Sequence, residues 1–275
     1  MSRASTARRT GPPVPTLRRE RRLWNEGHRL IVGVDEVGVA PTCGAVVAAA
    51  VIMREGCHRI PGVRDSKTLS MVQRERLAPI IRKRALAIGI GAASVTEIDR
   101  LNIYHATHLA MRRAVARVGP HDHVLVDGRR IFGFEEHAGP YTAIIDGDAL
   151  CYSISCASIV AKVVRDRLMA KLAARYPWYG WEHNRGYSSP DHRRAIAAHG
   201  VTPHHRRSFA TVREALYGEQ SALGLLGDAF APPLEEPPIE EPPMDSRDAV
   251  AVAIEPEALR AVMIDVEAEA ALSPP

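Results

Sequence analysis

The sequence predicts an α/β fold, with one domain of buried strands and amphipathic helices between residues 23 and 217. Three observations predict it. Short continuous apolar runs have the length and composition of strands that are covered on both faces. Segments with helical periodicity are interspersed among these runs. Hydrophobic residues make up 46% of the 275 residues, which is ample for a buried core.

The apolar runs predict five strands in chain order. The first lies at 30–34 and the second at 44–53. A third follows at 86–95, and two shorter strands lie at 124–126 and 141–145. The chain contains no internal repeat, so we expect one continuous α/β domain.

Three helices are predicted between and after these strands. The first spans 70–85 and begins at Ser70, a favourable N-cap residue, and the second spans 102–117. The third spans 154–175. Its spacing places four apolar residues inward and four charged residues mostly outward: Ile159, Val163, Leu168 and Leu172 inward, and Lys162, Arg165, Asp166 and Lys171 outward.

The two ends of the chain carry opposite charges. Residues 1–22 contain seven arginines and one glutamate among prolines, so we expect a disordered basic arm, with an organellar transit peptide as the minority alternative. Residues 218–275 carry 13 acidic groups against two arginines and are rich in Pro and Glu, so we expect a disordered acidic tail. Residues 1–217 have a net charge of +15, which favours a polyanionic partner such as nucleic acid.

Composition and motifs also exclude several classes of protein. The longest apolar run, 45–53, is about half of what a bilayer span needs, and the Arg-rich start leads into no signal region. The four cysteines form no C-x-x-C pair and have no zinc-ligand spacing. The chain has neither a G-x-S-x-G elbow nor a P-loop. We therefore expect a cytoplasmic protein with no membrane partner.

Acidic residues follow three of the apolar runs. Asp35 and Glu36 follow the first, Asp127 follows the run at 124–126, and Asp148 follows the last. Strand ends are where ligands gather in open α/β sheets. Carboxylates that converge there repel one another unless protons or cations compensate them, and hard oxygen ligands select Mg²⁺ or Mn²⁺. The sequence therefore predicts a hydrolytic metal site.

The adjacent pair Asp35 and Glu36 needs a local bend to serve one site. Neighbouring residues of a regular strand face opposite sides of the sheet, and Gly38 makes a bend plausible. Two metal ions about 4 Å apart would activate a water and spread the phosphate charge without a nucleophilic side chain.

An ordered set of motifs in residues 28–210 resembles ribonuclease HII. In chain order these motifs are Val34-Asp35-Glu36-Val37-Gly38, the run 46–51, Asp65-Ser66-Lys67-Thr68-Leu69, Val126-Asp127-Gly128, Gly147-Asp148, the run 156–163 with Arg165-Asp166, Asn184-Arg185-Gly186-Tyr187 with His192, His199-Gly200-Val201-Thr202-Pro203, and His205-Arg206-Arg207-Ser208-Phe209. No extra N-terminal substrate-binding domain of the kind found in ribonuclease HIII is apparent. The HII branch is therefore favoured.

The resemblance implies a ribonuclease H-like fold, with a central mixed five-stranded sheet flanked by helices and a C-terminal helical extension. It implies metal-dependent hydrolysis of RNA paired with DNA, leaving 3′-hydroxyl and 5′-phosphate ends. By position, Asp35, Glu36, Asp127 and Asp148 would bind Mn²⁺ or Mg²⁺ and be catalytic. Asp146 stands where the family usually has a lysine; it is either close to the metals or solvent-facing, and we favour the latter.

The resemblance also implies a set of substrate-binding residues. Tyr187 would stack on a sugar just past the scissile phosphate, where RNA passes into DNA. Lys67, Lys162, Arg185, Arg206 and Arg207 would contact phosphates. The histidines at 183, 192, 199, 204 and 205 are expected to be structural or phosphate-facing, because the carboxylates suffice for the chemistry.

The sequence departs from the family pattern directly after the first two acids. The family has alanine and then Gly-Arg-Gly, whereas this chain has Val37 and then Gly38, Val39 and Ala40. In the family this tripeptide approaches the 2′-hydroxyl of the ribonucleotide that is cleaved. We therefore expect weakened incision at single ribonucleotides embedded in DNA, with hydrolysis itself retained.

The expected partner is an RNA–DNA hybrid or a ribonucleotide-containing DNA duplex, bound by a monomer. A protein partner for the acidic tail is unknown. One alternative is a hybrid-binding protein with little or no turnover. Another is a relaxed two-metal nuclease that tolerates DNA.

Overall fold

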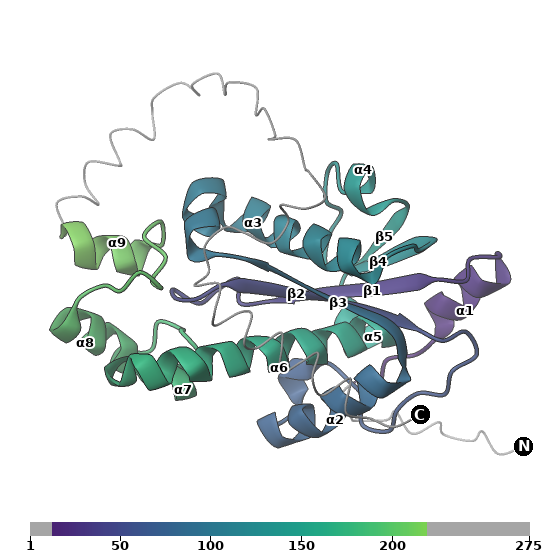
Figure 1. Cartoon of the computed structure of the whole chain (residues 1–275), viewed down its shortest axis with the longest axis horizontal. Coiled ribbons are helices and arrows are strands. Elements are labelled where there is room, and N and C mark those ends of the chain that lie inside the picture. The colour runs from purple at the N-terminus through teal and green to yellow at the C-terminus, as the bar shows by residue number, and fades with distance from the viewer. Residues whose placement is uncertain (1–12, 219–275) are drawn as a thin grey trace, which may run out of the picture.

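A computed structural model describes residues 13–218 of the chain (Figure 1). Its centre is a five-stranded sheet with the strand order β3-β2-β1-β4-β5. β1 pairs antiparallel with β2, and β2 pairs antiparallel with β3, whereas β1–β4 and β4–β5 are parallel. The predicted mixed sheet is therefore confirmed.

The five strands lie where the apolar runs predicted them, with ends that differ by a few residues. They are β1 (Ile31–Val37), β2 (Val46–Met53), β3 (Ala85–Ala93), β4 (His123–Asp127) and β5 (Tyr141–Ile144). Every residue of β2 is buried, because β2 lies inside the sheet and both of its faces are covered.

Helices cover both faces of the sheet (Figure 1). On one face α3 (Val95–Val118) packs on β3, β2 and β1. On the other face α6 (Tyr152–Arg175) packs on β1 and β2, and α2 (Met71–Arg84) lies against α6. Two glycines allow these close contacts. A Cβ at Gly91 would lie 2.0 Å from the Ala110 carbonyl oxygen, and one at Gly33 would lie 2.3 Å from the Ser153 carbonyl carbon.

Capping side chains define where α2 and α3 begin. Ser70 caps α2, as predicted, in a capping box with Gln73. α3 begins earlier than predicted, at a second capping box made by Ser94 and Glu97. Asn102 has φ 64° inside it, and its Oδ1 accepts hydrogen bonds from the amides of Tyr104 and His105. The predicted start at 102 is thus an internal cap, and the true start carries the S-x-x-E spacing of a capping box at Ser94 and Glu97.

The predicted boundary at residue 22 needs correction, because α1 (Arg18–Asn25) crosses it. Glu20 is 1% exposed, and its Oε1 accepts hydrogen bonds from the Ser153 amide at 2.8 Å and from Cys151 Sγ at 3.2 Å. Leu17 and Trp24 are buried beside it. The single acid among the arginines therefore anchors this segment to the start of α6. Residues 1–12 of the predicted arm lie outside the described residues.

A group of short helices follows α6 and forms the predicted C-terminal helical extension. They are η2 (Pro177–Tyr179), α7 (Trp181–Asn184), α8 (Pro190–His199) and α9 (Ala210–Tyr217). Tyr179, Trp181 and Ile196 form a small core with Met169 and Leu172 of α6. The predicted acidic tail, beyond residue 218, lies outside the described residues.

α6 contains the clearest error in the predicted helix faces. Arg165 and Asp166 were expected to point mostly outward, but they are 0% and 5% exposed. α6 lies between the sheet, α2 and the short C-terminal helices, so its charged residues face protein on several sides. No helix in residues 13–218 has the length and apolar character needed to cross a membrane.

The remaining elements are connections that shape the site. η1 (Ser66–Thr68) lies between β2 and α2, and α4 (Glu135–Ala138) lies between β4 and β5. α5 (Gly147–Leu150) follows β5 directly and leads into α6.

Candidate functional site

Three carboxylates from distant parts of the chain meet beside β1. Asp35 lies on β1, Asp127 ends β4, and Asp148 lies in α5; one oxygen of each lies within 4.8 Å of the others. Val34 is paired with Val126 in the parallel ladder, which places Asp35 and Asp127 at neighbouring positions. The sequence-predicted convergence of these acids therefore occurs in the structure.

The cluster has unfavourable electrostatics as long as it holds only carboxylates. Burial, followed by repulsion from Glu36 and Asp127, raises the pKa of Asp35 well above its ordinary value. Burial and then Asp148 raise the pKa of Asp127. Closely spaced, buried carboxylate oxygens are the donor set that suits a hard divalent cation, so these residues fit Mg²⁺ or Mn²⁺.

Glu36 lies next to this group but outside the three-carboxylate cluster. The antiparallel ladder of β1 with β2 continues through Val37, so Asp35 and Glu36 follow the normal alternation of a strand. Gly38, with φ 95°, turns the chain only after the two acids. Burial and then Asp127 raise the pKa of Glu36 to about 7, which shows that its charge still interacts with the cluster.

The turn from β5 into α5 positions two of the acids. The Gly147 amide donates a 2.7 Å hydrogen bond to Asp127 Oδ1, and a Cβ at Gly147 would lie 2.8 Å from Ile154 Cδ1. Lys67 Nζ lies 3.2 Å from Asp148 Oδ2, and the Lys67 side chain is otherwise 77% exposed. Asp146 directly precedes α5, has a left-handed backbone conformation and is exposed, in agreement with the solvent-facing interpretation.

Several predicted substrate-binding residues lie at the surface. Val39 is 37% exposed and Tyr187 is 47% exposed, and Ala40 and Arg207 are also exposed. Gly38 is buried at the base of the loop that carries Val39 and Ala40.

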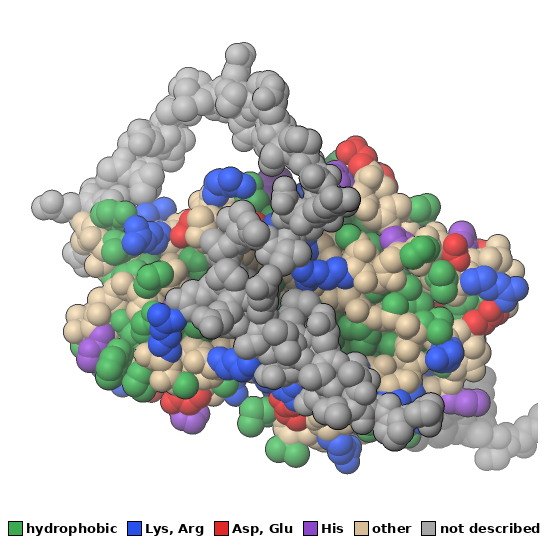
Figure 2. All heavy atoms as spheres, in the orientation of Figure 1, with side chains coloured by type: hydrophobic (Ala, Val, Ile, Leu, Met, Phe, Trp, Pro, Cys, Tyr) green, Lys and Arg blue, Asp and Glu red, His purple; other side chains and the backbone are tan. Residues whose placement is uncertain are grey.

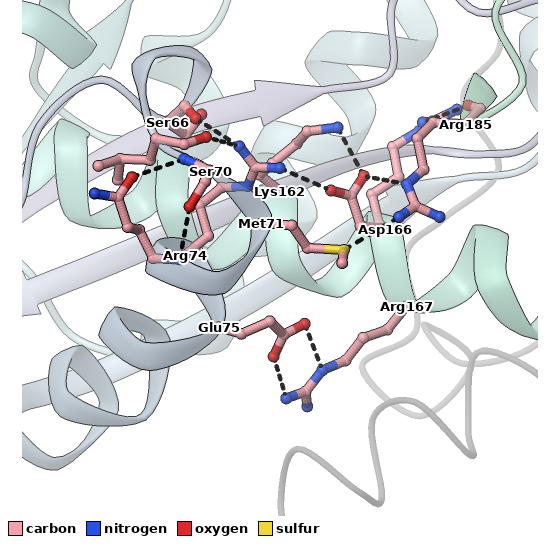
Figure 3. A network of polar contacts seen from close by, with 12 residues as sticks. Ser66, Ser70, Met71, Arg74, Glu75, Lys162, Asp166, Arg167 and Arg185 are labelled. Carbon is pink, nitrogen blue, oxygen red and sulfur yellow. Dashed lines mark hydrogen bonds and ion pairs between the residues drawn. The ribbon is translucent and has the colours of Figure 1, made fainter. Parts of the chain in front are cut away.

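Lys162 and Arg185 are not isolated phosphate contacts but share a buried carboxylate (Figure 3). Lys162 Nζ lies 2.7 Å from Asp166 Oδ1, and Arg185 Nε lies 3.7 Å from the same oxygen. Arg74 Nη2 lies 3.4 Å from Asp166 Oδ2. Three cations around one carboxylate leave positive charge beside α6, which a phosphate could still approach.

The expectation that Arg206 contacts a phosphate is contradicted by its position. Arg206 is 0% exposed. Its Nε donates to the Gly44 carbonyl at 2.9 Å, Nη1 donates to the Val39 carbonyl at 2.8 Å, and Nη2 donates to the Gly38 carbonyl. Burial and then the charge of Arg165 lower the pKa of Arg206 to about 9. Its guanidinium therefore holds a loop rather than a ligand.

Arg165 is a second buried arginine, and its contacts were not predicted from the sequence. Its Nε, Nη2 and Nη1 donate to the carbonyls of Ala45, Cys43 and Arg185, at 3.0, 3.1 and 3.0 Å. The available signal was its spacing, four residues after Ala161 and three before Leu168, which places Arg165 on an apolar helix face.

The histidines divide into structural and exposed groups. Trp181 Nε1 donates to His192 Nε2 at 2.9 Å, His192 Nδ1 pairs with the Tyr187 carbonyl at 2.9 Å, and His205 Nε2 lies 3.1 Å from His192 Nε2. Burial lowers the pKa of His205 to about 3, so both buried rings are neutral and structural. His183 and His199 are exposed, and His204 is partly buried.

Comparisons with known proteins agree with this geometry. A family model described as Ribonuclease HII matches residues 32–212. The chain is 55% identical over 192 residues to ribonuclease HII of Thermosynechococcus vestitus, covering 69% of this chain and 88% of the relative. It is 52% identical over 203 residues to ribonuclease HII of Myxococcus xanthus, covering 73% and 68% of the two chains. The crystal structure of ribonuclease H2 from Pyrococcus horikoshii OT3 superposes with a TM-score of 0.59 at 26% identity, covering 70% of this chain and 98% of that chain.

Proposed function

The chain belongs to the ribonuclease HII family, and from this premise we propose that it is a metal-dependent endoribonuclease that hydrolyses the RNA strand of RNA–DNA hybrids. The observation that carries the proposal is the convergence of Asp35, Asp127 and Asp148 in a buried cluster. Their oxygens come from β1, β4 and α5, so the fold itself keeps the mutually repelling groups together.

We assign Asp35, Glu36, Asp127 and Asp148 as the residues that hold Mg²⁺ or Mn²⁺. When bound, the cations supply Lewis-acid chemistry that activates water and stabilises negative charge on a phosphodiester. The side chains define the position of that chemistry: the Gly147 amide orients Asp127, and Lys67 both neutralises Asp148 and reaches toward solvent.

Substrate binding is assigned to the surface around this cluster. Lys67, Arg207, Lys162 and Arg185 would position phosphates without reading sequence, and Tyr187 would stack where RNA passes into DNA. The loop with Gly38, Val39 and Ala40 would approach the 2′-hydroxyl. Val39 and Ala40 are exposed, so this part of the loop is accessible to a substrate.

Gly38-Val39-Ala40 differs at two positions from the Gly-Arg-Gly of the family pattern, and only the difference at Val39 would weaken incision at a single ribonucleotide. Ala40 has no positive φ, so a glycine is not needed there for backbone conformation. At position 39 the family has arginine and this chain has valine. The missing guanidinium would weaken binding of the phosphate, because a charge-assisted hydrogen bond to phosphate is strong. Recognition of a lone ribonucleotide depends on every such contact.

Cleavage of three labelled duplexes tests this proposal: a continuous RNA–DNA hybrid, DNA with one embedded ribonucleotide, and plain DNA, each in Mg²⁺ and in Mn²⁺. We expect efficient cleavage of the hybrid, slower incision at the single ribonucleotide, and no cleavage of plain DNA. Hybrid binding without cleavage in either metal would identify a hybrid-binding protein instead. Cleavage of plain DNA would identify a relaxed nuclease.

A further inference from the structure

We propose that Arg165 is a positioning residue that fixes the distance between two recognition loops. The first, residues 38–45, follows β1 and is called the reader loop. The second, residues 184–188, carries Tyr187 and is called the tyrosine loop. The inference rests on the proposed function, because the two loops are assigned there to the ribose and DNA sides of the cleaved step.

The guanidinium of Arg165 lies between the two loops and binds both. Two of its nitrogens donate to the reader loop, at the carbonyls of Cys43 and Ala45, and the third donates to the Arg185 carbonyl of the tyrosine loop. A Cβ at Gly38 would lie 2.1 Å from Arg165 Nε, so the reader loop also packs directly on this side chain. The rigid, planar fork therefore sets one relative position of the loops.

Direct contacts between the loops complete the arrangement. The Thr42 amide and Oγ1 both donate to the Gly186 carbonyl, at 2.9 and 3.2 Å. Gly186 has φ 84°, and a Cβ there would lie 2.8 Å from the Cys43 carbonyl oxygen. The tyrosine loop consequently cannot move toward or away from the reader loop without breaking these hydrogen bonds.

Arg206 provides a built-in comparison because its hydrogen bonds reach only one of the two loops. Its three donors end on the carbonyls of Gly38, Val39 and Gly44, and its guanidinium lies 5.0 Å from the centre of the Phe209 ring. Both arginines are 0% exposed, but only Arg165 joins the reader loop to the tyrosine loop.

The chemistry of these contacts favours a role in recognition. Burying two guanidiniums that bind only neutral carbonyls is costly, and well-packed apolar side chains could brace a loop with less desolvation. The two arginines instead bind five carbonyls of the reader loop with buried guanidinium donors, so these oxygens point into the protein. They belong to Gly38, Val39, Cys43, Gly44 and Ala45. Those oxygens would repel a phosphate, so turning them inward presents a surface that a polyanion can approach.

A substrate with a single ribonucleotide can be cleaved only where both loops contact the same step of the duplex. A continuous hybrid can instead be cleaved at many positions along its RNA strand. Loss of the Arg165 fork should therefore reduce incision at a lone ribonucleotide more than cleavage of the hybrid. A general loss of stability would reduce both activities together, so the ratio of the two kcat/KM values separates positioning from a merely structural role.

The experiment uses the full-length chain with Arg165→Lys, which keeps the charge and loses the fork, and Arg165→Gln, which removes the charge. Arg206→Lys is the comparison variant, because Arg206 binds the reader loop but not the tyrosine loop. Arg167→Lys is the matched control, on the same helix and paired with Glu75 outside both loops. Two readouts are taken on each protein: amide hydrogen exchange in residues 38–45 and 184–188, and the ratio of kcat/KM for the single ribonucleotide to kcat/KM for the hybrid.

We expect both Arg165 variants to exchange at least about tenfold faster in both loops and to lower the kcat/KM ratio by about tenfold. Arg206→Lys should accelerate exchange in 38–45 alone, and Arg167→Lys should change neither readout. Wild-type exchange in the tyrosine loop of Arg165→Lys, or an unchanged kcat/KM ratio, overturns the proposal.

Thr42→Val keeps the test decisive if the Arg165 variants do not fold. It removes only the Oγ1 contact with Gly186 and should raise exchange in both loops about threefold. Unchanged exchange in either loop would disprove the coupling. If the wild-type protein cleaves neither substrate, the proposed function fails, while the exchange readout still decides whether Arg165 joins the loops.

Discussion

At the scale of single residues, the carboxylate cluster makes opposite demands on activity and stability. Asp35, Asp127 and Asp148 repel one another, and burial adds to the cost of their charges. Without a bound cation, such carboxylates lower the stability of the folded protein. We therefore expect them to serve function and not folding. The cluster is therefore the place where a neutral substitution should separate the two properties.

Asp127→Asn should abolish cleavage of the hybrid while leaving the protein folded. The amide keeps the shape and can still accept the Gly147 hydrogen bond, but it removes one negative charge from the cation site. We expect kcat/KM to fall by at least about 1,000-fold, equivalent to about 4 kcal/mol. Without added metal, the midpoint of thermal unfolding should be unchanged or higher. Near wild-type cleavage at saturating Mg²⁺ or Mn²⁺ would rule out this residue as a ligand.

Val39→Arg should increase incision at a single embedded ribonucleotide by at least about tenfold, with a smaller effect on the continuous hybrid. The side chain at this position reaches the surface, and a guanidinium there would be placed to contact the phosphate of the ribonucleotide that the reader loop binds. Ala40→Gly is the matched control and should have little effect, because Ala40 does not occupy the left-handed region. If Ala40→Gly increased incision at the single ribonucleotide and Val39→Arg did not, the weakened incision would be due to Ala40 and not to Val39.

The convergence of Asp35, Asp127 and Asp148 could be predicted from the sequence, but the position of Arg206 could not. An acid directly after an apolar strand has a local signature, and three such signatures indicate convergence. Arg206 stands among His205, Arg207 and Ser208 and has the sequence context of a surface cation. Its burial depends on carbonyls more than 160 residues earlier in the chain, which no local pattern contains.

At the scale of elements, the strands were predicted better than the helices. Each strand is a short apolar run, and burial on both faces makes that run continuous. α6 instead contacts the sheet, α2 and the C-terminal helices, so no single polar face exists and periodicity gave the wrong orientation for Arg165 and Asp166. α1 was missed because Glu20, its buried anchor, lies in a run of arginines that is typical of a flexible arm.

The element formed by α7, α8 and the following turn should respond to acid through His205. Its folded-state pKa of about 3 lies below the usual value near 6.5, so the unfolded chain binds the proton more tightly. Stability is therefore complete above about pH 6.5 and is lost as the pH falls toward 3. From pH 7 to pH 5, this histidine should lower the free energy of unfolding by about 2 kcal/mol.

Urea unfolding at pH 7 and pH 5 measures this effect, with His205→Gln compared with the wild-type protein. The variant should be less stable at pH 7 but should lose less stability on acidification. His183→Gln, at an exposed position, is the control and should keep the wild-type difference between the two pH values. An equal difference in His205→Gln would show that other groups carry the acid sensitivity.

At the scale of the whole molecule, the two parts of the sequence carry opposite charges. Residues 13–218 contain 31 Lys and Arg residues against 19 Asp and Glu residues. Figure 2 shows Lys and Arg side chains on several parts of the visible face, with fewer Asp and Glu side chains among them. We propose that residues 218–275, with a net charge of −11, shield this surface from nonspecific nucleic acid.

Deletion of residues 218–275 should leave the fold intact and tighten binding to duplexes of any sequence. The dependence of affinity on salt should also become steeper, because more phosphates displace counterions when the tail no longer competes. Fluorescence anisotropy at three or more salt concentrations measures both quantities. A tail of the same length with its acids replaced by Gln and Asn is the control and should behave as the deletion does. Identical affinity and salt slope in all three proteins would show that the tail has no shielding role.

The parallel pairing of β1 with β4 has a consequence for the newly made chain. Asp35 and Asp127 become neighbours only after α2, β3 and α3 have been synthesised between them, and Asp148 follows still later. Contacts of such large sequence separation form late in folding, because loop closure must be achieved first. A nascent or partly folded chain therefore cannot assemble the hydrolytic centre, and no incomplete form of the protein should attack the nucleic acids that surround it during synthesis.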